Sequence, residues 1–208
     1  MKKQGKILAL LLSVLFILTA FSACGSGKKD AEKFVGTWKA EISMDETLNK
    51  EAAGDDMGKY MKFEGCSIAV FYTFDADGTY SVKVDRETVE GCLTRIYEAF
   101  GKGATEYLEE EVKNLGLDIT LDDFLSFSGV TMDELLDGAM EAMAEVIEEN
   151  IREFEITGKW EAENGKLYST ESVDETIDKS EYDLYELNGD ELKILGGEDE
   201  PDLVLVRQ

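Results

Sequence analysis

Histidine is absent from the 208-residue chain, and proline occurs once, at Pro201. Histidine is the commonest general base near neutral pH and the commonest metal ligand, so its absence excludes serine–histidine triads and histidine-bound zinc. Basic side chains are also scarce, with 21 Lys and Arg against 46 Asp and Glu. Because so negative a chain repels phosphate backbones, the composition argues against nucleic acid as a partner.

Cysteine is rare too, with Cys24, Cys66 and Cys92 as the three examples. Cys66 falls in an apolar, strand-like run and Cys92 on the apolar side of a helical pattern, which favours two separately buried thiols. A disulfide between them stays open as the alternative, because a secreted chain enters a compartment where disulfides persist.

The N-terminus has the layout of a secretory signal, with three lysines in the first six residues and then an apolar run over residues 7–21. This run is too short for a comfortable membrane span. It ends in Phe-Ser-Ala-Cys at 21–24, which resembles the bacterial lipobox. The resemblance implies that residues 1–23 are removed and that Cys24 is diacylated, so that the chain is anchored to the cell membrane on its extracytoplasmic face. The alternative is a plain signal peptide followed by a chance cysteine.

Residues 24–33 are small, polar and basic, which is typical of a flexible tether. Three basic residues and no acid lie in the signal, so 18 basic and 46 acidic side chains remain, a net charge of −28. The 185 residues left after removal of the signal are enough for one domain with a sizeable core, which we place at 34–208.

The first half of this domain begins with strand patterns. Alternating apolar residues predict a strand over 38–44, and a short helix or helical loop follows over 45–62. Two β-rich runs, 66–74 and 80–84, flank the pair Asp77–Gly78. An Asp-Gly pair between such runs is a strong hairpin signal.

From residue 86 to about residue 152 the apolar spacing becomes helical. The pattern predicts a first helix with a break at 101–103. Two further helix starts have capping-box spacing, at Thr120–Asp123 and at Thr131–Glu134. The second of these begins a long helix with one apolar stripe.

Strand patterns then resume, with Asn-Gly turn pairs at 164–165 and 188–189. Together with the earlier runs they make eight strands, the number that closes into a barrel around a side-chain core or one small ligand. A two-sheet sandwich with a helical cap satisfies the same pattern. The five later strands are expected at 154–162, 166–171, 181–187, 191–195 and 203–207.

Several of these segments resemble a known family. Gly36-Thr37-Trp38 resembles the Gly-x-Trp signature on the first strand of lipocalins and related calycins, and the segments 74–80, 158–160 and 188–194 resemble lipocalin-like domains of bacterial lipoproteins. The resemblance implies an α+β fold that is mainly β, namely an eight-stranded antiparallel lipocalin-like barrel interrupted by a helical insertion.

In calycins an arginine near the end of the barrel stacks on the first-strand tryptophan. The resemblance therefore implies that Arg207 and Trp38 form a latch at the closed end of the barrel. Its expected role is structural.

Four aromatic residues are candidates for lining a ligand cavity: Tyr72, Phe74, Tyr80 and Tyr168. The same side chains would also fill a solid barrel core, and that interpretation is favoured.

Neither acidic motif predicts a metal site. Residues 75–78 (Asp-Ala-Asp-Gly) echo the start of a calcium loop, but the twelfth position, which needs Glu, holds Arg86. The acids of 109–111 fit a solvated helix face. We therefore expect no metal, no cofactor and no catalytic residue.

The expected function is non-catalytic binding of a small, apolar ligand in or at the mouth of the barrel. Met132, Met140 and Met143 give the long helix an adaptable apolar side that could cover the barrel. The alternative is an envelope lipoprotein with a filled core that binds a partner protein through its acidic helices. An enzyme is the third candidate.

Overall fold

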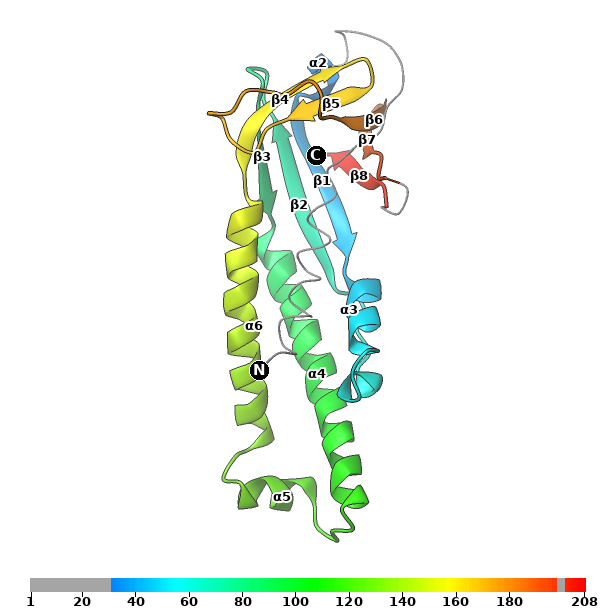
Figure 1. Cartoon of the computed structure of the whole chain (residues 1–208), viewed down its shortest axis with the longest axis vertical. Coiled ribbons are helices and arrows are strands. Elements are labelled where there is room, and N and C mark those ends of the chain that lie inside the picture. The colour runs from blue at the N-terminus through cyan, green and yellow to red at the C-terminus, as the bar shows by residue number, and fades with distance from the viewer. Residues whose placement is uncertain (1–30, 198–200) are drawn as a thin grey trace. The chain divides into compact units, whose positions relative to one another are not determined.

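The structure is a computed structural model, and residues 31–197 and 201–208 are described (Figure 1). The predicted signal peptide, Cys24 and the tether up to residue 30 lie outside the described residues. The last three residues of the expected tether, 31–33, instead belong to the short helix α2 (Ala31–Phe34). The folded part therefore starts before Phe34.

The described residues divide into two compact units. The barrel unit comprises residues 31–42, 69–85, 151–197 and 201–208. The helical unit comprises residues 43–68 and 86–150.

Eight antiparallel strands close into a barrel, each paired with its neighbours in chain order. Strand β8 returns to β1, where Trp38 lies opposite Arg207 and Lys39 opposite Val206. Closure removes the sheet edges that would otherwise pair with other chains. The strands are β1 (Gly36–Ser43), β2 (Ser67–Phe74), β3 (Thr79–Val84), β4 (Thr157–Glu163), β5 (Lys166–Ser169), β6 (Asp183–Asn188), β7 (Glu191–Ile194) and β8 (Leu203–Arg207).

The predicted eight-stranded antiparallel barrel with a helical interruption is thus confirmed, and the closed strand order decides against the sandwich. Several strand boundaries differ from the prediction, and the largest difference is at the start of β4. The strand expected from residue 154 begins at Thr157, because the preceding helix continues to Phe154.

Tight turns set the register of the hairpins. In the β2–β3 turn the Asp77 carboxylate accepts hydrogen bonds from the Thr79 N–H (2.9 Å) and hydroxyl (2.7 Å). Asn164 and Gly165 both have positive φ, at 57° and 75°, as a two-residue turn of the primed type requires. The segment that echoed a calcium loop is therefore a β-turn.

The helical unit contains four whole helices and all of a fifth, α6, except its last turn. They are α3 (Asp45–Ala52), the 3-10 helix η1 (Met57–Tyr60), α4 (Arg86–Asn114) and α5 (Leu121–Phe127), and α6 spans Met132–Phe154. Both predicted caps form. The Thr120 hydroxyl accepts from the Asp123 N–H, and Thr131 and Glu134 bond each other's backbone N–H reciprocally.

The expected break at residues 101–103 is wrong, because α4 runs through both glycines without interruption. A Cβ on Gly103 would lie 2.6 Å from Met61 Cγ and 3.1 Å from the Tyr60 backbone, and one on Gly101 would lie 3.2 Å from Leu136 Cδ1. These glycines let neighbouring segments approach α4 closely. The cost of glycine in a helix, about 1 kcal/mol, is offset by that packing.

A disulfide joins Cys66 to Cys92, both of them buried in the helical unit. The favoured prediction of two separate thiols is therefore wrong. Asp45 at the start of α3 accepts hydrogen bonds from the backbone N–H groups of Gly65 and Cys66, both at 2.8 Å. These bonds hold the segment before β2 where its cysteine meets α4.

The disulfide predicts a measurable loss when it is removed. Cys66 and Cys92 are 26 residues apart, and closing a loop of this size stabilises a fold by about 3 kcal/mol. We expect the double variant Cys66→Ala/Cys92→Ala to lose about that free energy of unfolding in urea denaturation. Reductant should lower the stability of the wild-type protein and leave the double variant unchanged. Equal stability of the oxidised and the double-variant proteins would contradict the bond.

Candidate functional site

The end of the barrel where β1 begins is closed by Arg207. Its guanidinium carbon lies 4.1 Å from the centroid of the Trp38 ring, and its Nη1 donates a 2.8 Å hydrogen bond to the Val35 carbonyl. A further guanidinium nitrogen donates to the Lys33 carbonyl. The structure thus brings together the two residues expected to form the latch, and the guanidinium also holds the segment that enters β1.

Gly36 is required by this arrangement. Its φ of +130° is one that L side chains rarely adopt, and a Cβ there would lie 2.8 Å from Arg207 Nη1. The glycine of the Gly-x-Trp motif therefore makes room for the guanidinium.

Phe34 fills the barrel interior beside the latch, and its side chain is fully buried. Its ring centroid lies 5.5 Å from those of Phe74 and Trp160 and 4.6 Å from that of Tyr185. The Trp38 indole N–H donates a 2.7 Å hydrogen bond to the Phe34 carbonyl, so α2 is fixed to β1. At this level Phe74, a candidate cavity residue, belongs to a packed aromatic cluster.

Sequence reasoning placed Phe34 at the junction with a flexible tether and missed this role. The available signal was a large aromatic residue two positions before the Gly-x-Trp motif. A fully buried phenylalanine contributes about 2–3 kcal/mol.

Tyr72 and Tyr80 face the interior beside this cluster. Their strands place Phe74 opposite Tyr80 and Tyr72 opposite Val82, and side chains two residues apart on a strand share a face. Tyr80 is buried, and its hydroxyl donates a 3.1 Å hydrogen bond to the Thr170 carbonyl. Burial raises the pKa of the Tyr80 phenol to about 12, against the smaller opposing effect of a hydrogen bond with Ser169.

Gly158 makes the position of Tyr80 possible. It pairs with Tyr80 across β3 and β4, and a Cβ there would lie 2.8 Å from Tyr80 Cε1 and 1.8 Å from the Thr170 carbonyl oxygen. Any larger residue at 158 would displace the tyrosine ring or the backbone that accepts its hydrogen bond.

Tyr72 differs from Tyr80 in that its hydroxyl has no protein hydrogen-bond partner among the described residues. Burial raises the pKa of its phenol far above the ordinary value, and the nearby Tyr80 and Asp183 raise it further. Its hydroxyl makes no hydrogen bond with any described residue. The hydroxyl is nevertheless accessible to solvent, because Asn150 Nδ2 is the only side-chain polar atom of residues 31–197 and 201–208 that is both inaccessible and without a hydrogen-bond partner. Tyr72 as a whole is half-buried.

Polar groups from two other strands share this inner face. Ser169 lies opposite Trp160 on β5, and Asp183 lies opposite Leu167 on β6, where Leu167 pairs with the buried Ala162. Ser169 and Asp183 were not among the predicted site residues. The sequence feature that could have identified each as inward-facing is its position two residues from a buried apolar residue on the same strand.

Tyr168 is not a cavity residue. It lies opposite the exposed Glu161, between two residues that face inward, and so points to the outside of the barrel. There it packs against the Tyr182 ring at 5.9 Å and lies under the Lys179 ammonium, 4.2 Å from the ring centroid. Its burial comes from the loop between β5 and β6, which strand alternation alone does not describe.

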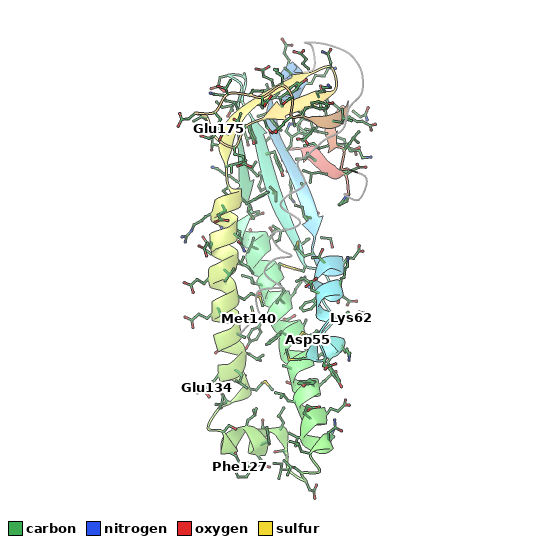
Figure 2. The ribbon with its side chains drawn as sticks, in the orientation of Figure 1. Asp55, Lys62, Phe127, Glu134, Met140 and Glu175 are labelled. Carbon is green, nitrogen blue, oxygen red and sulfur yellow. A yellow bond between two sulfur atoms is a disulfide. The ribbon has the colours of Figure 1, made fainter. Side chains whose placement is uncertain are left out.

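The acids singled out in the sequence are dispersed. Glu110 accepts a 2.6 Å hydrogen bond from the Tyr60 hydroxyl, and the other two acids of 109–111 are exposed on α4. Within the described residues no three Cys, Asp or Glu side chains come together as a metal site. The three methionines Met132, Met140 and Met143 lie half-buried on α6, where Figure 2 labels Met140.

Comparisons with known proteins add no relative. No family model, no curated protein and no solved structure matches this chain. Among the described helices, none has the length and hydrophobicity to cross a membrane.

The latch predicts a large effect of truncating Trp38, whose side chain is fully buried. Trp38→Ala should lower the free energy of unfolding by about 3–5 kcal/mol, because a large cavity opens and the Phe34 carbonyl loses its donor. Urea denaturation followed by circular dichroism measures this loss. A loss below about 1 kcal/mol would show that the latch contributes nothing. Val204→Ala, at an exposed position of β8, is the control and should change the stability little.

Proposed function

We propose that this chain is a membrane-anchored lipoprotein that binds a small molecule, without catalysis, in its barrel. The ligand has an apolar body and one group that hydrogen bonds to the Tyr72 hydroxyl. The closed barrel is compatible with ligand binding, and the observation that carries the proposal is the half-buried Tyr72, whose hydroxyl lies on the inner face beside buried aromatic residues and makes no hydrogen bond with any described residue. A polar group in such surroundings is costly unless water or a ligand satisfies it.

The chemistry around Tyr72 supports this ligand class. Its neighbours on the inner face are mainly apolar and aromatic, including Val82 and Phe74, while the Tyr80 phenol and the Asp183 carboxylate add a few polar groups. Small-molecule sites in proteins combine a mostly apolar lining with few polar groups that fix orientation.

The proposed location follows from the N-terminal signal and agrees with the disulfide. A disulfide between Cys66 and Cys92 persists in an oxidising compartment and is rare in the cytosol. We place the folded body on the extracytoplasmic face of the cell membrane, held by lipid on Cys24. Its acidic surface makes nucleic acid an unsuitable partner.

The lipid anchor is tested directly by metabolic labelling. Cells that express the wild-type chain in the presence of a radioactive fatty acid should yield a labelled protein, and Cys24→Ala should yield none. Labelling of the alanine variant would show that lipid is not attached at Cys24. Cys66→Ala is the matched control and should label as the wild type does.

Ligand binding is tested on residues 25–208 exported to the envelope of the native cell and purified. Native mass spectrometry should show a discrete extra mass, and the extracted molecule should bind Tyr72→Phe about fivefold more weakly, since one hydrogen bond of about 1 kcal/mol is lost. Tyr168→Phe removes the same atom outside the barrel and should bind as the wild type does. A bare wild-type mass, or equal affinity of Tyr72→Phe, would contradict the proposal.

A further inference from the structure

Exposed apolar side chains gather at one end of the helical unit. Of the eight large apolar residues that are exposed among the described ones, five lie within residues 115–135, and the other three are valines of the barrel unit. Large apolar groups that gather on a surface mark interaction sites far more often than scattered ones do. We name this end the helical tip and define it by Leu115, Leu117, Ile119, Phe127 and Leu135.

The helical tip is formed by three connected pieces. Leu115, Leu117 and Ile119 lie in the link from α4 to α5, Phe127 is the last residue of α5, and Leu135 lies in the first turn of α6. Figure 1 shows α5 joining the ends of α4 and α6, and Figure 2 shows Phe127 at this end. Phe127 is 82% exposed and Leu115 is 63% exposed, so neither residue stabilises the fold by burial.

The charge around the tip is predominantly negative, although the exposed Lys113 lies two residues before Leu115. No basic residue occurs between Lys113 and Arg152, a stretch that holds ten Asp and Glu. Five of these acids interleave with the apolar residues and are exposed: Asp118, Asp122, Asp123, Asp133 and Glu134. Glu134 and Asp123 also bond the two cap threonines, so the local structure holds them at the tip.

This combination limits the occupant. A second copy of the chain would bring the same negative charge against itself, and an anionic lipid surface would be repelled in the same way. A basic segment with apolar side chains satisfies both properties, because its cations face the acids while its apolar groups cover the exposed Leu and Phe side chains.

We propose that the helical tip docks a basic, apolar segment of another envelope protein. Phe127 is the central anchor, since aromatic side chains contribute most to such interfaces. The acidic residues around it speed association and select against acidic partners. This interaction is independent of the ligand proposed for the barrel.

The test uses the full chain in its own cell envelope, with Phe127→p-benzoylphenylalanine as a photoreactive probe. Irradiation should give a discrete adduct with one other protein, and the peptide that is cross-linked should be net basic and contain large apolar residues. The same probe at Val204, an exposed apolar position of the barrel unit, is the matched control and should give no such adduct.

Charge reversal then tests the chemistry. Asp122→Lys/Asp123→Lys in the probe-bearing chain should reduce the adduct at least fivefold, whereas Glu181→Lys/Glu186→Lys on the exposed barrel surface should leave it unchanged. Unchanged thermal unfolding of each variant would show that it is folded. Any of five outcomes would overturn the proposal: an adduct of twice the chain's mass, an adduct with lipid alone, a net acidic cross-linked peptide, no adduct, or an adduct yield that charge reversal at the tip does not reduce.

Discussion

The hydrogen bond from the Trp38 indole to the Phe34 carbonyl, beneath the Arg207 guanidinium, is the contact on which the barrel depends. Together with the contact between Arg207 and the Trp38 ring, it joins the first strand, the last strand and the short helix before the barrel at one place. Arg207 adds hydrogen bonds to two carbonyls of the incoming chain and requires glycine at position 36. The first and last strands, which would be the two edges of an open sheet, are thereby held together.

This closure also decides what the interior can do. Phe34 occupies the space beside Phe74, Trp160 and Tyr185, so the aromatic residues at that level act as a core. Next to them lie two tyrosines that differ in their hydrogen bonding, since the Tyr80 hydroxyl donates to the Thr170 carbonyl and the Tyr72 hydroxyl bonds no described residue. The proposal of a ligand rests on that difference between two tyrosines on paired strands.

Much of the fold could be predicted from local patterns, because period-two alternation and turn pairs are short-range signals. The features that were missed depend on contacts distant in sequence. The pairing of Cys66 with Cys92 requires the residues just before β2 to contact α4. Gly103 does not end a helix, because the segment of η1 packs against it. Tyr168 has the alternation of a strand but lies outside the barrel, because a loop buries it there.

The claim that α2 is docked into the barrel is tested most directly by hydrogen exchange of the Trp38 indole N–H, followed by nuclear magnetic resonance. Exchange should be as slow as that of the best-protected strand amides, since this N–H is buried and bonded to the Phe34 carbonyl. Exchange within minutes under native conditions would contradict it. In that case residues 31–34 would belong to the tether and the barrel would be open at this end.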